Sequence, residues 1–215
     1  MGPVVLFLLE VALEPYLPLT PTTLLYRSPA DDVLTVEVLA VEVDGAPAAV
    51  RMGSDRTRRI ESFSAEEGLL VHRLGLGRSG ELVYERPLVI LPARMKLGEV
   101  HSSQRRFARM RGGSKEDVGA HYVEAELLGI EELSISGEVF AECLRIRRHE
   151  TRMDFSGGQE VYDATEWYAK GIGLVKAQGE RLEKNDGGEV VSRSVIELSL
   201  VTTSPPIRDS VRRSW

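Results

Sequence analysis

Apolar and polar residues alternate with a period of two along most of this 215-residue chain. Leu34, Val36 and Val38, for example, are separated by Thr35 and Glu37. Such alternation is typical of β-strands that bury one face of an antiparallel sheet and expose the other. Turn signals follow the alternating runs at intervals of about ten to fifteen residues, and no segment carries a sustained apolar stripe at helical spacing.

The pattern therefore predicts an all-β fold: a single curved antiparallel sheet or half-barrel of about nine to twelve strands with little helix, given strands of about 5–6 residues plus turns. We expect at most one helical turn, at residues 131–133, and a bulge near Leu39, where the phase of alternation changes. Residues 87–97 contain two prolines and are expected at a sheet edge or in a connection. No linker divides the chain, so we expect one antiparallel domain over residues 1–203 and a basic, proline-stopped tail over residues 204–215.

The most specific stretch is residues 165–176, which contains one of the two tryptophans followed by Gly-Ile-Gly. Glycine adopts the positive φ values of a tight reversal without strain, so this stretch predicts a strand, a turn and a second strand. The turn would bring Trp167 and Tyr168 close to Leu174 and Val175. We expect Trp167 to be a packing anchor of the sheet; the alternative is that Trp167 and Tyr168 form a platform for a ligand or partner on the concave face.

Three stretches resemble one known family. Residues 166–176, EWYAKGIGLVK, resemble the "WYA-x-GvGlVk" signature of a family of uncharacterised bacterial envelope domains. Residues 137–146 are similar to the cysteine-containing "aGtF-x-x-C-x-x-v" strand entry of that family. Residues 92–101 resemble its "Pl-x-x-G-x-x-W" entry, with His101 where an aromatic residue is usual, and a weaker copy of that entry lies within residues 16–27.

The resemblance implies a curved sheet similar to that of the lipoprotein-localisation carrier proteins, in the periplasm or cell envelope. The family has no agreed activity, so the resemblance implies no catalytic residue. The residues alone leave a cytoplasmic location open, because there is no clear signal peptide: residues 3–9 are apolar, but no Lys or Arg precedes them and Glu10 interrupts them. This run is either a first strand or short helix packed on the domain, or the remnant of a trimmed signal. No segment is long enough to be a transmembrane helix.

The composition excludes several classes of site. Lys and Arg number 27 against 33 Asp and Glu, and the net charge of −6 makes nucleic acid an unlikely partner. The single cysteine, Cys143, excludes an intrachain disulfide and a cysteine-only metal site, and we expect it to be a small buried hydrophobe. No nucleophile elbow, phosphate loop or dinucleotide fingerprint is present, and no motif spacing for metal ligands involves the four histidines, His72, His101, His121 and His149. We therefore expect no enzymatic activity, no cofactor and no metal ion.

One basic cluster exceeds the background charge of the chain. It consists of Arg105, Arg106, Arg109, Arg111 and Lys115. In a strand, three of its arginines, at positions 105, 109 and 111, share one face. Basic residues interleaved with an aromatic residue, here Phe107, are able to bind a polyanion or an anionic membrane surface. The alternative is a solvated sheet face that is salt-bridged to the acidic residues at 124 and 126.

Three functions remain in competition. The leading hypothesis is a non-enzymatic binding or structural domain of the bacterial envelope, which holds an apolar small molecule, a lipid-like ligand or a protein partner on a concave apolar face. The second is an enzyme whose groups assemble only in three dimensions. The third is an intracellular polyanion-binding module that uses the Arg105–Lys115 cluster. Apolar side chains along the concave face would support binding, whereas converging polar groups with shifted pKa values would support catalysis.

Overall fold

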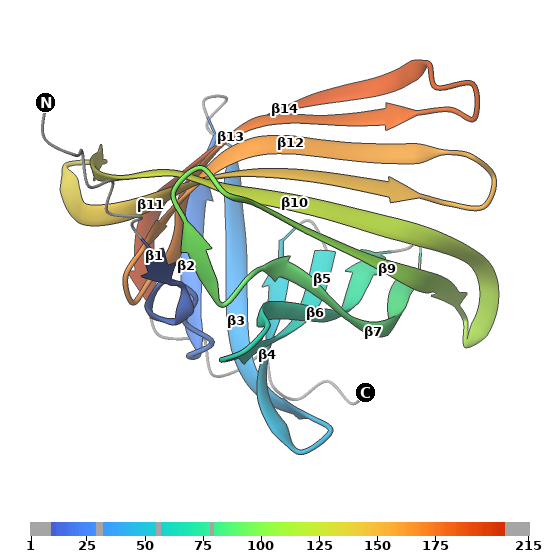
Figure 1. Ribbon diagram of the computed structural model, residues 1–215, viewed down its shortest axis with the longest axis horizontal. Helices are drawn as coiled ribbons and strands as arrows, with labels where there is room; N and C mark the ends of the chain where they lie inside the picture. Colours follow the sequence, from blue (N-terminus) through green and yellow to red (C-terminus); the bar gives the residue numbers. More distant parts are fainter. Residues whose placement is uncertain (1–9, 29–31, 55–56, 78–79, 205–215) are drawn as a thin grey trace, which may run out of the picture.

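The strands form a closed antiparallel barrel (Figure 1). The computed structural model describes residues 10–28, 32–54, 57–77 and 80–204. The twelve barrel strands, in chain order, are β2 (Thr22–Arg27), β3 (Val33–Val43), β4 (Ala46–Gly53), β5 (Thr57–Ser64), β6 (Gly68–Leu76), β7 (Glu81–Leu91), β9 (Val100–Arg111), β10 (Ser114–Ile135), β11 (Glu138–Met153), β12 (Gln159–Ala169), β13 (Gly173–Lys184) and β14 (Val190–Ser204). The all-β prediction is confirmed, and the sheet closes on itself where a half-barrel was expected.

Neighbours around the barrel follow chain order, and the ring closes where β14 pairs with β2. Figure 1 shows β10 to β14 as long strands that run side by side and extend past the shorter strands β2 to β7. The expected apolar run at residues 3–9 lies outside the described residues, as does all of the expected tail beyond residue 204.

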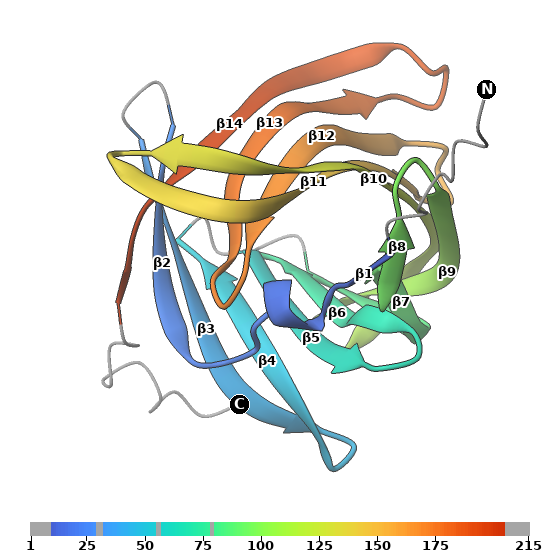
Figure 2. The same ribbon diagram turned by 60° about the vertical axis from the view of Figure 1, so that its left-hand side comes forward.

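A short segment lies across one end of the barrel (Figure 2). It comprises β1 (Glu10–Ala12), which pairs with β8 (Arg94–Lys96), and the 3-10 helix η1 (Glu14–Tyr16). The backbone N–H of Leu13 donates to the carbonyl oxygen of Ala93 at 3.0 Å. The N–H of Gly171, at the β12–β13 turn, donates to the carbonyl oxygen of Pro15 at 2.8 Å. These bonds fasten this end segment to two distant parts of the barrel.

Two clusters of buried apolar side chains stabilise the barrel. The first includes Leu13 and Leu17 of the end segment together with Phe107 and Ile146 of the barrel wall. The second consists of Leu24, Tyr26, Val38, Ala49, Ile135, Phe140, Cys143, Trp167, Ala169, Val175 and Leu200. Burial of each large side chain is worth about 1.5–3 kcal/mol relative to exposure, so the two clusters supply most of the driving force for closure.

The predicted hairpin is confirmed. Strands β12 and β13 pair through the register Tyr168↔Leu174, and the turn between them contains Gly171 at φ 74° and Gly173 at φ 97°. One detail differs: Trp167 pairs with Lys176, because the register shifts by one residue between Trp167 and Tyr168. Adjacent residues of a strand point to opposite faces of the sheet, and Trp167 and Tyr168 accordingly belong to different apolar clusters.

Two local predictions were wrong. Residues 131–133 lie inside β10 and form no helical turn. The register of β3 with β4 continues without a shift through Leu39, and the change of alternation there coincides with the end of pairing to β2 at Val38.

The expectation for residues 87–97 is confirmed, because β7 has no ladder partner in β9 beyond Tyr84 and residues 92–93 connect it to the short strand β8. Pro87 falls in an interruption of the β6–β7 ladder, where its missing N–H costs no ladder hydrogen bond.

Replacement of Trp167 by alanine tests its role as a packing anchor. Trp167 is 8% exposed, and its indole Nε1 donates to Glu131 Oε1 at 2.6 Å. We expect the variant to lower the free energy of unfolding by about 3–5 kcal/mol, the usual cost of emptying a buried aromatic site. Urea unfolding followed by circular dichroism measures the change. The control is Phe155→Ala at a site that is 78% exposed, which should cost less than about 0.5 kcal/mol. Equal, small effects of both substitutions would contradict the assignment.

Candidate functional site

The barrel interior contains an open cavity of about 1000 Å³. It extends from Leu17 and Gly173, beside the end segment, to Glu183 and Ser194 in the long parts of β13 and β14. We call it the barrel cavity. Most of its apolar lining comes from β3, β6, β7, β13 and β14 and includes Leu34, Val36, Leu69, Val71, Leu74, Leu76, Ile90, Leu174, Ile196 and Leu198.

Charged side chains line another part of the same cavity. Arg51 on β4 and Arg59 on β5 are direct cross-strand partners, an arrangement of like charges that is unfavourable by itself. Glu61 lies two residues after Arg59 and is completely buried. Its Oε2 accepts a hydrogen bond from Arg51 Nε at 2.5 Å, and its Oε1 lies 2.7 Å from Arg59 Nε. One carboxylate therefore neutralises the repulsion of both guanidinium groups.

A second ion-pair group comes from β11 and β12. Arg148 lies 2.7 Å from Glu166 and 2.8 Å from Glu150, through different guanidinium nitrogens. Its guanidinium carbon is 4.8 Å from the centre of the Tyr162 ring, which adds a cation–π contact. The hydroxyl groups of Tyr162 and Tyr168 donate to the two oxygens of Glu166 at 2.6 and 2.7 Å. We define the arginine–glutamate cluster as Arg51, Arg59, Glu61, Arg148, Glu150 and Glu166.

Two further polar groups adjoin this cluster. His121 lies 2.8 Å from the Tyr84 hydroxyl through Nδ1 and 3.2 Å from Glu150 through Nε2. Toward the far end of the cavity, Glu160 pairs with Arg152 and lies 3.3 Å from Arg181. The polar lining thus consists of three groups in which each charge lies beside an opposite charge, as burial of charged groups requires.

The pKa shifts of these glutamates and tyrosines keep each group in the charge state that it ordinarily has at neutral pH. Burial raises the pKa of Glu61, but the charges of Arg59 and Arg51 outweigh burial and hold the pKa below its usual range. Burial of Glu150 is outweighed in the same way by Arg148 and by the hydrogen bond to His121, so its pKa is far below the usual range. Burial raises the pKa values of the tyrosines above the usual range, at Tyr26, Tyr84 and Tyr162. At neutral pH the carboxylates are therefore ionised and the phenols are protonated.

The two aromatic candidates from the sequence lie in different places. Tyr168 lines the barrel cavity and donates to Glu166. Trp167 belongs to the second apolar cluster and does not line the cavity. A binding role for either residue stays a prediction, but only Tyr168 is in a position to contact a molecule inside the barrel.

The basic cluster lies on β9, apart from Lys115 at the start of β10, and two of its arginines contact other residues of the chain. Arg105 donates to the carbonyl oxygens of Pro87 at 3.1 Å and Gln104 at 2.8 Å, while Arg109 lies 4.0 Å from Asp154. Arg111 is exposed at the end of the strand.

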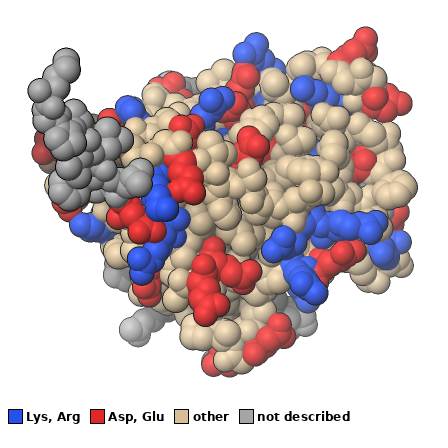
Figure 3. Space-filling view, viewed as in Figure 1, with Lys and Arg blue, Asp and Glu red and all other residues tan. Residues whose placement is uncertain are grey.

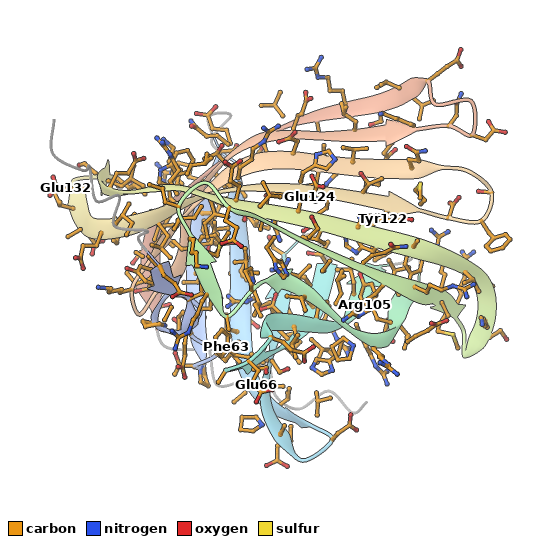
Figure 4. The ribbon with its side chains drawn as sticks, viewed as in Figure 1. Phe63, Glu66, Arg105, Tyr122, Glu124 and Glu132 are labelled. Atoms are coloured by element: carbon orange, nitrogen blue, oxygen red, sulfur yellow. The ribbon has the colours of Figure 1, made fainter. Side chains whose placement is uncertain are left out.

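The expected acidic complement of these arginines was placed wrongly. In the β9–β10 register Arg105 faces position 121, and Glu124 pairs with Ser102 further along the strand. Figure 4 shows Arg105 and Glu124 apart on the two strands. Figure 3 shows basic side chains interspersed with acidic ones over this face.

Cys143 is fully buried, and burial together with the charge of Glu131 raises the pKa of its thiol. Both effects disfavour a thiolate.

Within the described ranges, no three His, Cys, Asp or Glu side chains are grouped as ligands for a metal ion. No helix in the part of the chain that the structure describes is long and apolar enough to cross a bilayer.

Sequence reasoning missed the arginine–glutamate cluster. On β11, Leu144 and Ile146 are completely buried, and Arg148 and Glu150 continue the same parity along the strand. The available signal was this change from apolar to charged residues on one face, since alternation places all four on the same side of the sheet.

Comparisons with known proteins add one structural likeness. No family model and no curated protein sequence matches the chain. The crystal structure of the hypothetical lipoprotein YmcC from Escherichia coli (K12) is similar over 89% of this chain and 90% of that chain, at 11% sequence identity and a TM-score of 0.43. At this identity and TM-score the likeness transfers no property, so membership of the envelope family stays a prediction.

Substitution of Glu61 by glutamine tests how the buried arginines are held. The neutral side chain would leave Arg51 and Arg59 facing each other without a counter-charge. We expect the free energy of unfolding to fall by about 3 kcal/mol, the lower end for breaking a buried ion pair. Chemical denaturation measures the loss, and Glu85→Gln at an exposed position of β7 is the matched control. A loss no larger than that of the control would show that Glu61 is not needed.

The pH dependence of stability provides a separate test. Below the ordinary glutamate pKa of about 4.3, the unfolded chain binds protons that the depressed groups Glu61 and Glu150 do not bind in the barrel. Above the ordinary tyrosine pKa of about 10, the unfolded chain releases protons that the folded barrel retains on residues such as Tyr84. The free energy of unfolding should therefore be highest between these limits and decrease on both sides. Urea unfolding over a pH series measures the profile, and a flat acid limb would contradict the ionised state of these glutamates.

Proposed function

We propose that this protein is a non-enzymatic binding barrel that holds an amphipathic, lipid-like molecule in the barrel cavity. The observation that carries the proposal is a single cavity of about 1000 Å³ in which an apolar lining adjoins the arginine–glutamate cluster. Ligand cavities typically have volumes of about 300–1000 Å³, mostly apolar walls and a few polar groups that fix orientation. A molecule with one apolar chain and one polar end matches both parts of this lining.

Two features support binding over catalysis. A general acid or base works best with a pKa close to the operating pH, whereas the shifts of Glu61, Glu150 and Tyr84 all lead away from neutrality. Tyr84, His121 and Glu150 form a hydroxyl–imidazole–carboxylate chain of contacts, which resembles a nucleophile, a base and its orienting carboxylate in a catalytic triad. However, the raised pKa of Tyr84 keeps its phenol protonated, so it is a weak nucleophile.

The cellular setting and the alternatives are part of this proposal. The sequence signature in residues 166–176 favours the envelope, where amphipathic molecules are abundant. The polyanion-binding alternative is weaker, because the guanidinium of Arg105 is engaged by backbone carbonyl groups and Arg109 lies beside a carboxylate. A protein partner on the outer surface is the remaining alternative.

Binding of an uncharged fluorescent amphiphile tests the proposal. N-Phenyl-1-naphthylamine should become strongly fluorescent with the delipidated protein, and Leu74→Trp should weaken its binding at least about tenfold by filling the cavity beside the apolar wall. Val191→Trp adds the same side chain at an exposed site outside the cavity and should bind like the unchanged protein. Thermal melting confirms that both variants are folded. No fluorescence change, or equal binding by both variants, would reject binding inside the barrel.

A further inference from the structure

The arginine–glutamate cluster has more hydrogen-bond donors than acceptors. Every carboxylate oxygen of Glu61, Glu150 and Glu166 lies within 3.2 Å of a guanidinium, imidazole or hydroxyl group. Ionised carboxylates are acceptors only, and each oxygen already lies beside a cationic or hydroxyl group, although Glu61 Oε1 and Glu150 Oε1 contact their arginines without hydrogen-bond geometry. A molecule that brings further donors, such as an alkylammonium, would compete with partners already in place.

The donors, in contrast, are in excess. An arginine carries five N–H groups in a planar fork, and Arg59 uses only Nε, toward Glu61, among the interactions with described residues. Its side chain is 34% exposed and lines the cavity. Arg148 Nε is buried and has no hydrogen-bond partner within the described part of the chain. The three guanidinium groups of this cluster therefore offer more N–H donors than its carboxylates use.

The distribution of charge favours an anion on the β4–β5 side of the cluster, beside Arg59. Arg51 and Arg59 share the single charge of Glu61, which leaves an excess of one positive charge on the β4–β5 side. The opposite excess belongs to Glu150 and Glu166, which are covered by Arg148, His121 and two tyrosine hydroxyl groups. An anion beside Arg59 would thus meet a cation whose own counter-ion is shared.

Arg59 also adjoins the apolar lining. Its direct cross-strand partner on β6 is Leu74, and Leu76 follows on the same strand; both line the cavity. A molecule whose polar end contacts the Arg59 guanidinium would have its chain against this wall. The cavity thereby provides an anion contact and an apolar track on neighbouring strands.

We propose that the barrel cavity selects amphiphiles with an anionic oxygen headgroup, a carboxylate or a phosphate, and that the outer guanidinium nitrogens of Arg59 bind this headgroup. The planar fork of arginine matches two oxygens of either group. This inference rests on the proposed function and adds the class of headgroup to it. Arg51 and Glu61 act as positioning residues, because they fix Arg59 Nε and direct the rest of its fork into the cavity.

Competition among matched amphiphiles tests the proposal. Dodecanoate, dodecyl phosphate, dodecanol and dodecylammonium, each below its micelle-forming concentration, displace N-phenyl-1-naphthylamine from the wild-type protein. We expect at least one of the two anions to displace the fluorophore at a concentration about tenfold lower than dodecanol or dodecylammonium, the size of effect that a charged hydrogen bond gives. The two anions compared with each other distinguish a carboxylate from a phosphate source.

Variants of Arg59 assign the selectivity. Arg59→Gln should raise the effective concentration of the preferred anion about tenfold, to that of dodecanol, and leave dodecanol unchanged. Arg59→Lys keeps the charge but not the fork and should recover only part of the preference. Arg86→Gln removes the same charge from an exposed position of β7 and should change nothing. Thermal melting identifies any variant that is not folded.

Each failure has a separate meaning. If none of the four amphiphiles displaces the fluorophore from the wild-type protein, the proposed binding function fails. If all four displace it equally, or dodecylammonium displaces it best, the barrel binds amphiphiles but the headgroup inference is overturned. This wild-type comparison decides the inference even if Arg59→Gln does not fold. A wild-type preference for an anion that persists in Arg59→Gln would remove Arg59 from the site.

Discussion

Glu61 is fully buried beneath two arginines that face each other across strands β4 and β5. Without this carboxylate, two positive charges would repel inside the barrel, where low polarity strengthens their interaction. With it, Arg51 and Arg59 share a counter-charge, and both line the cavity. The ion pairing that makes this interior possible therefore also holds Arg59 in the cavity wall, as the proposed headgroup contact requires.

The barrel class was predictable because its signal is local and repeated. Alternation in stretches such as Leu34–Val38, and the Gly-Ile-Gly turn after Tyr168, specify strands and reversals from neighbouring residues alone. Closure was not predictable, because it depends on β14 meeting β2 across almost the whole chain. The bulge expected near Leu39 failed for a related reason: a change of alternation also arises where a strand loses one of its neighbours.

The candidate site was harder to predict than the fold. From residue type alone, Arg148 and Glu150 would be predicted on the surface, since charged residues are seldom buried without partners. Their parity with Leu144 and Ile146 places them inside, but the compensating residues lie on other strands. Sequence proximity links Arg59 to Glu61, whereas only the β4–β5 register links both to Arg51. Pairing across strands carries the information that the sequence pattern lacks.

The seam between β14 and β2 also has a consequence for how the chain folds. Thr22 hydrogen-bonds to Ser204 across a sequence separation of 182 residues, so the ring cannot close until both strands have been synthesised. Topologies dominated by such distant contacts fold slowly, and unfinished sheets expose surfaces that promote aggregation. In the open sheet, the six charged side chains of the future interior would be hydrated and would interrupt its apolar face. The same charges thus oppose self-association of the nascent chain before any cavity exists.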